Sequence, residues 1–124
     1  MKGVATDTRQ FFENYIRAIS GKPKTRELVR EFVADSALEG HILQVEASFP
    51  SYEVAVHDLV VEGELVALRG TFHGVHSGTF AGIEPTGREV SEDVMIFYRI
   101  VDDRIRQFWM QMDMGALVSK LSGS

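Results

Sequence analysis

The sequence predicts an α+β fold, a cone-shaped α+β barrel in which three N-terminal helices pack into a curved antiparallel sheet. Two observations lead to this prediction. Apolar residues recur at helical spacing as far as Pro50. From Tyr52 onward the chain consists of stretches rich in Val, Ile, Phe and Tyr, separated by Gly, Pro and acidic residues. We expect one domain over residues 1–124.

The first two helices follow from apolar spacing and from end signals. The first carries a set of apolar residues on one face: Phe11, Phe12, Tyr15, Ile16 and Ile19. Thr6 and Asp7 precede this pattern as possible caps, and the pattern stops at Gly21. Thr25 can cap a second helix, which we expect to end near Asp35.

The third helix is predicted to begin at a capping box, in which Ser36 is followed by Glu39. One face then stays apolar until Pro50. The residues of this face are Leu38, Ile42, Val45 and Phe49.

Four antiparallel strands are expected over residues 52–61, 65–74, 89–101 and 104–113. Residues 62–64 and 102–103 predict tight hairpin turns. The loop 77–87 is long for a hairpin, and long ordered loops often carry function. Residues 114–121 form either a short helix or a frayed tail.

The composition excludes several classes of protein. The net charge is −5 without a basic run, so nucleic acid is a poor partner. No apolar run approaches the ~20 residues of a membrane-spanning helix. The N-terminus lacks the apolar core of a secretory signal, so we expect a cytoplasmic protein. Without cysteine, the chain has no disulfide, thiol nucleophile or cysteine-based metal site.

The last strand carries large apolar residues on both faces. Alternation places Ile105, Gln107, Trp109, Gln111 and Asp113 on one face, and Arg106, Phe108, Met110 and Met112 on the other. One face would then look into the cone. The other would meet a partner, most simply a second copy in a homodimer.

Several short motifs carry a resemblance to a known family. In chain order they are Phe49-Pro50, Gly74-Val75-His76-Ser77-Gly78 with Phe80, Gly82-Ile83-Glu84-Pro85-Thr86-Gly87-Arg88, Tyr98-Arg99-Ile100, and Trp109 through Asp113. With these motifs the chain resembles the SnoaL-like polyketide cyclases, or ester cyclases, of the nuclear-transport-factor-like, cystatin-like superfamily. The resemblance covers most of residues 10–122.

The resemblance implies the cone-shaped fold, a frequent dimer and no metal or organic cofactor. It also implies ring closure in polyketide methyl esters by intramolecular aldol condensation, with an aspartate as acid and base that maps onto Asp113. The chain departs from the family between its second and third helices. There Asp35 and Ser36 run almost directly into the third helix, so a pocket wall differs.

Asp113 is the candidate catalytic residue. Aldol closure needs a base that removes a proton beside a carbonyl and an acid that protonates the new hydroxyl oxygen. One carboxyl group can serve as both if apolar neighbours such as Trp109 raise its pKa. The alternative is an exposed aspartate that caps the turn after the strand.

Five further residues are candidates for binding a hydrophobic substrate: Tyr15, His41, Phe72, His76 and Trp109. Tyr15 can donate a hydrogen bond into the cavity, and His41 can act as a proton shuttle. His76 can line the mouth, while Phe72 and Trp109 can form aromatic walls. Each has a plain alternative, as a core residue or, for His76, as a support for its loop.

No metal site is expected. His73 and His76 look like a pair of ligands, but an offset of three in a strand places them on opposite faces. No nucleotide-binding, serine-hydrolase or zinc-protease motif occurs in the sequence. An epoxide hydrolase of the same fold would need an arginine held between two acids, and no Arg-x-Asp spacing occurs.

Two functions remain open. The first is a cofactor-free acid/base enzyme acting on a hydrophobic carbonyl compound, either a polyketide ester cyclase or an isomerase. The second is a non-catalytic module that binds small molecules or dimerises and keeps the same fold.

Overall fold

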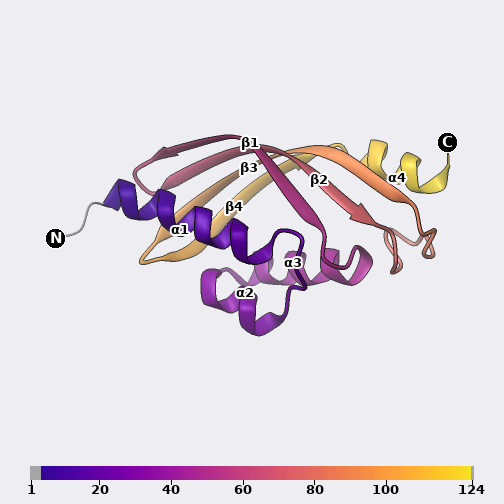
Figure 1. Ribbon diagram of the computed structural model, residues 1–124, viewed down its shortest axis with the longest axis horizontal. Helices are drawn as coiled ribbons and strands as arrows, with labels where there is room; N and C mark the ends of the chain where they lie inside the picture. The colour runs from indigo at the N-terminus through magenta and orange to yellow at the C-terminus, as the bar shows by residue number, and fades with distance from the viewer. Residues whose placement is uncertain (1–3, 124) are drawn as a thin grey trace.

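Figure 1 shows the computed structural model of the chain, which describes the backbone of residues 4–123 and the side chains of residues 8–123. Its elements are α1 (Val4–Ile19), α2 (Arg26–Phe32), α3 (Ser36–Ser48), β1 (Glu53–Glu62), β2 (Leu65–Val75), β3 (Glu89–Val101), β4 (Arg104–Met112) and α4 (Met114–Ser122). The strands form one antiparallel sheet in the order β1-β2-β3-β4. The sheet curves over α1, α2 and α3, and α4 lies at its far end (Figure 1). The predicted α+β fold is confirmed.

The first helix starts earlier than expected. α1 begins at Val4, so Thr6 and Asp7 lie within it rather than ahead of it. Their side chains, and any capping by them, lie outside the described residues. No helix within residues 4–123 is both long and apolar enough to cross a bilayer.

The second helix is capped as predicted but is shorter. The hydroxyl of Thr25 accepts a hydrogen bond of 3.1 Å from a backbone amide of the first turn. α2 ends at Phe32, before the expected end near Asp35. Its C-cap residue Val33 has extended backbone and pairs with Ile105 of β4, which draws the chain out of the helix.

The predicted capping box of the third helix is wrong. Asp35, not Ser36, is the N-cap, because its carboxylate accepts a hydrogen bond of 2.9 Å from the backbone N–H of Leu38. Glu39 is instead engaged by the guanidinium of Arg30, at 2.8 Å. This ion pair ties α2 to α3.

The strands lie close to their predicted bounds. β3 has the predicted bounds, while β1 lies one residue later and β2 ends one residue later. β4 ends at Met112, and Asp113 follows as the N-cap of α4. Residues 114–121, for which a frayed tail was the alternative, are helical.

A bulge in β4 changes the predicted alternation of side chains. Arg99 pairs with Gln107 and Ile100 with Ile105, so Arg106 is an extra residue without a partner on β3. An extra residue shifts every later side chain to the opposite face. Ile105 is therefore not on the same face as Gln107.

The outcome is visible in the burial of β4. Ile105 is fully buried and packs with Phe108, Met110 and Met112 in the main core. Trp109 lies on the opposite face, where 49% of its surface is exposed. The face of β4 that looks toward the helices is thus the one that carries Phe108.

The Gly-Val-His-Ser-Gly motif is explained by close packing against the end of α3. A Cβ atom on Gly74 would lie 2.9 Å from the Cβ of Phe49, and one on Gly78 would lie 2.2 Å from the carbonyl oxygen of Ala47. The amide of Gly78 also donates a hydrogen bond of 3.0 Å to the carbonyl of Ser48. These glycines allow the 77–87 loop to pack on α3.

Candidate functional site

An apolar cavity lies between the helices and the sheet. Its volume is about 90 Å³, and its walls come from α1, α3, α4 and all four strands. The wall residues are mostly aliphatic, aromatic or methionine. Among the described residues that line it, the polar side chains are Tyr15, His41, Tyr52 and Tyr98, and none is a carboxylate, lysine or arginine. Such a cavity suits a neutral apolar ligand that carries a hydrogen-bond acceptor.

Three of the four polar side chains that line the cavity within the described residues are buried tyrosines. Tyr15 of α1 and Tyr98 of β3 have ring centroids 6.3 Å apart, and Tyr52 precedes β1. Burial raises the pKa of all three hydroxyls, and their mutual proximity raises the pKa of Tyr15 further. They therefore stay protonated. None of the three hydroxyls forms a hydrogen bond to another described residue, so each is available to a ligand.

His41 lies at the rim of the cavity. It is half-buried on α3, and its ring centroid is 6.0 Å from that of Phe108 on the edge strand β4. Burial lowers the pKa of its imidazole, so the ring is neutral at neutral pH. It is the one group, among the described residues of the lining, that can accept a proton there.

Phe72 also lines the cavity, from β2. It is buried and packs edge-on against Phe49, with ring centroids 5.2 Å apart and an interplanar angle of 87°. The ring centroid of Tyr52 lies 5.4 Å from that of Phe72. Phe72 is thus both a wall residue and part of a second core cluster.

His76 is fully buried but does not line this cavity. Its Nδ1 accepts a hydrogen bond of 3.1 Å from the backbone N–H of Thr86 and lies 3.0 Å from the Thr86 hydroxyl. That hydroxyl accepts from the amide of Arg88, so its own proton can go to Nδ1. The ring proton is then on Nε2, which has no partner among the described residues. His76 supports the loop 77–87.

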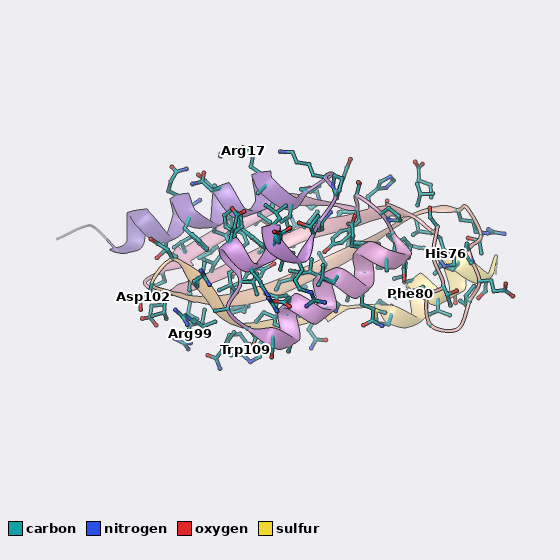
Figure 2. The ribbon with its side chains drawn as sticks, turned by 90° about the horizontal axis from the view of Figure 1, so that it is seen from below. Arg17, His76, Phe80, Arg99, Asp102 and Trp109 are labelled. Carbon is teal, nitrogen blue, oxygen red and sulfur yellow. The ribbon has the colours of Figure 1, made fainter. Side chains whose placement is uncertain are left out.

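Trp109 and Asp113 both lie away from the cavity. Trp109 is on the uncovered face, and Figure 2 shows it beside Arg99 along one long edge of the molecule, far from His76 and Phe80 at the end that carries α4. For Asp113 the structure has the arrangement given above as the alternative, a carboxylate that caps the turn after the strand. Asp113 is exposed, and its Oδ1 accepts a hydrogen bond of 2.9 Å from the backbone N–H of Ala116. It borders a shallow groove on the uncovered face together with Arg69.

No cluster of three or more histidine, aspartate or glutamate side chains within the described part of the chain is placed to hold a metal ion.

A sequence model described as SnoaL-like polyketide cyclase matches residues 29–121. The chain belongs to the SnoaL-like polyketide cyclase family. The search of curated proteins found no match. Forty chains among the solved structures match this chain, and three of them show how far the likeness extends.

The structure of TsrD from Streptomyces laurentii has a TM-score of 0.78 and 22% identity, covering 99% of this chain and 100% of that one. A candidate SnoaL-like polyketide cyclase from Jannaschia sp. CCS1 has a TM-score of 0.82 and 18% identity, covering 100% and 97%. A SnoaL-like polyketide cyclase from Agrobacterium tumefaciens has a TM-score of 0.73 and 19% identity, covering 92% and 97%. At these identities the likeness shows the fold alone.

Sequence reasoning missed part of the cavity wall of this SnoaL-like chain. Tyr98 was noted only as part of a motif, although it follows Val94 and Ile96 on one face of β3. The alternation of side chains along β3 places Tyr98 on the same face as Val94 and Ile96. It would have predicted Tyr98 as a wall residue if the sequence had also shown which face of β3 looks inward. The methionines of the rim, Met112 and Met114, flank Asp113 and were not considered as wall residues.

Proposed function

We propose that the chain binds a neutral, hydrophobic carbonyl compound in this cavity and catalyses proton transfer on it, as a ring-closing cyclase or an isomerase. The observation that carries the proposal is the set of unpartnered tyrosine hydroxyls in an apolar enclosure. Membership of the SnoaL-like polyketide cyclase family supports the same class of substrate.

The tyrosines suit the electrophilic side of such a reaction. Removing a proton next to a carbonyl places negative charge on the carbonyl oxygen, and a hydroxyl held in an apolar site stabilises that charge. Tyr15 and Tyr98 remain protonated because their pKa values are raised by burial. They can therefore donate a hydrogen bond to the enolate over the whole working pH range.

The family resemblance suggests Asp113 as an acid/base residue. Its neighbours Met112 and Met114 line the cavity, whereas its own carboxylate caps α4. Breaking an N-cap hydrogen bond of this kind lowers the stability of the protein by about 1 kcal/mol. A rotation of the side chain toward a bound ligand is therefore energetically accessible.

The size of the cavity places a condition on binding. Drug-sized ligands occupy pockets of roughly 300–1,000 Å³. The cavity of about 90 Å³ must therefore enlarge when a ligand enters. Methionine side chains change conformation readily. We therefore expect the cavity to enlarge first at the part of the wall formed by Met110, Met112 and Met114.

A matched pair of probes tests the proposed site. 2-Acetylnaphthalene has a carbonyl acceptor, whereas 2-ethylnaphthalene has a similar shape without one. We expect Tyr98→Phe and Tyr15→Phe each to weaken binding of the ketone about 5-fold, the loss of one net hydrogen bond, with the hydrocarbon unaffected. Affinity is measured by calorimetry or ligand-observed NMR. Equal effects on both probes would remove the tyrosines from carbonyl recognition, and binding of neither probe would contradict the proposed function.

The second candidate is a non-catalytic small-molecule binder. The described lining of the cavity contains no carboxylate, which favours this alternative. The pH dependence of ketone binding distinguishes the two. A group in the cavity that titrates with an abnormal pKa supports catalysis, and a flat profile supports a binder.

We also propose that the uncovered face of the sheet binds a second copy of the chain. The strand register aligns an apolar row across all four strands: Val60, Ala67, Phe97 and Trp109. Phe97 is 52% exposed and Trp109 49%. We call this set the outer row. Such a row is unusual on a free surface.

The charges beside the outer row fit a copy of the same face. On one side of the row Arg69 pairs with Asp58 at 2.7 Å. On the other side Arg99 lies 3.3 Å from Glu64. Each side thus carries both signs of charge, and two copies placed face to face would not repel each other.

A further inference from the structure

The wall of the cavity between α3 and β4 contains one pair of rings, whose centroids are 6.0 Å apart and whose planes are tilted by 32°. His41 projects from α3 toward Phe108 of β4, and both residues line the cavity. β4 is the last strand of the sheet, so no further strand covers this side among the described residues. His41 is half-buried, which places its imidazole between the interior and the solvent.

The imidazole of His41 is available to a ligand. Neither of its ring nitrogens forms a hydrogen bond to another described residue. The other histidines are each hydrogen-bonded to a hydroxyl: His57 to Thr71 at 2.7 Å, His73 to Ser91 at 2.8 Å and His76 to Thr86 at 3.0 Å. Only His41 combines a free ring with a place in the cavity wall.

The surroundings of His41 keep it neutral. The side chains that line the cavity from α3, β3, β4 and α4 are apolar apart from Tyr98, and the other titratable residues of the lining are Tyr15 and Tyr52. All three tyrosines stay uncharged because burial raises their pKa. Burial alone lowers the pKa of His41, without a contribution from a charged neighbour. At neutral pH the ring therefore presents a lone pair to a ligand.

Resting on the proposed function, we propose that His41 is the base that removes the proton next to the carbonyl of the bound ligand. The lone pair of one ring nitrogen takes the proton, and the C–H electrons form the enolate C=C bond. The carbonyl oxygen takes the negative charge and accepts a hydrogen bond from a tyrosine hydroxyl. In a ring closure the enolate carbon then forms a bond to a second carbonyl carbon of the same molecule. The imidazolium returns its proton to the resulting alkoxide, so no other reactant is needed.

His41 and Asp113 differ in the side-chain movement that each would need in order to reach a ligand in the cavity. Asp113 must leave its hydrogen bond with Ala116 and turn from the uncovered face. His41 needs no such change, because its ring already lies in the wall. The two assignments therefore differ in which substitution removes proton transfer while leaving binding intact.

The experiment follows proton abstraction on a probe that cannot cyclise. In deuterated buffer, exchange of the methyl protons of 2-acetylnaphthalene is measured by NMR for the wild type, H41Q, D113N and H57Q. We expect H41Q to lower the protein-dependent exchange rate at least ~100-fold, as removal of a general base does, with ketone affinity within about 2-fold. His57 lies on β1 outside the cavity, so H57Q serves as the matched control and should exchange like the wild type.

The acid limb of the pH profile gives a second readout. The active form of a base is the deprotonated one, so the exchange rate should fall as pH falls through the pKa of His41, which burial lowers from the usual value of a histidine. The NMR signal of the His41 ring should titrate with the same pKa and shift when the ketone binds. If H41Q fails to fold, H41F keeps the contact with Phe108 and replaces it.

The outcomes separate this inference from the proposed function. Loss of exchange in D113N but not in H41Q would overturn the role of His41 and leave the proposed function standing. Binding of the ketone by the wild type without exchange would overturn both the role of His41 and the proposed catalysis, and would leave the non-catalytic binder. Failure of the ketone to bind at all would contradict the proposed function itself.

Discussion

The two faces of the sheet are both apolar, but they are apolar in different ways. The inner face carries Ile96 and Tyr98 against the helices, where both are at least nine-tenths buried. The outer face carries Met95 and Phe97, which alternate with them along β3 and are more than half exposed. Ion pairs such as Arg69–Asp58 accompany the outer residues, whereas no charged group accompanies the inner ones in the described cavity wall.

The contrast shows what each face can do. Apolar residues packed beneath helices stabilise the monomer, and the gaps between them hold a ligand. Apolar residues bordered by exposed charges contribute little to the monomer, but they can bind a second copy. The following substitutions test this division.

The largest expected difference is between two neighbouring aromatic residues of β3. Tyr98→Ala removes a buried ring whose centroid lies 4.7 Å from that of Phe12. We expect this substitution to lower the free energy of unfolding by about 3–5 kcal/mol. Phe97→Ala removes an exposed ring, and we expect a loss within about 0.5 kcal/mol. Urea unfolding at low protein concentration measures both. Similar losses in the two variants would show that the faces are not divided as described.

The next effect concerns association through the outer row. Phe97→Glu places a buried charge in the proposed interface, and we expect the dimer dissociation constant to rise at least ~30-fold, equivalent to about 2 kcal/mol. Sedimentation equilibrium over a range of concentrations measures it. Glu27→Gln on α2, away from the outer face, is the control and should leave association unchanged. A wild-type chain that stays monomeric at high concentration would contradict the proposed homodimer.

Most of the fold could be predicted because its signals are local. Helical spacing ending at Gly21 and the change to β-rich segments after Pro50 gave element bounds close to those observed. The errors were at positions where a tertiary contact competes with a local signal. Val33 leaves α2 to pair with Ile105, and Asp35 takes the cap that Ser36 was expected to provide.

The site was less predictable because alternation defines two faces but does not say which one is inside. Trp109 is the largest residue of β4, yet the bulge at Arg106 leaves Ile105 buried and puts Trp109 outside. Such a bulge depends on pairing with β3 and has no sequence signal of its own here. Tyr15 and His41 were found because a helical stripe has one apolar side. Tyr98 was missed because both faces of β3 are apolar.

The smallest effect concerns Asp113, which lies between the cavity-lining residues Met112 and Met114 but has an exposed side chain. Its carboxylate accepts the amide hydrogen of Ala116 and caps α4, which helps to close the cavity through Leu117. We therefore expect Asp113→Ala to lower the free energy of unfolding by about 1 kcal/mol and Asp113→Asn to leave it nearly unchanged, since asparagine caps as well as aspartate. Thermal or urea unfolding of the two variants measures this difference. If the alanine variant were as stable as the asparagine one, the carboxylate would not be held at the helix and would be free to turn toward a ligand without loss of stability.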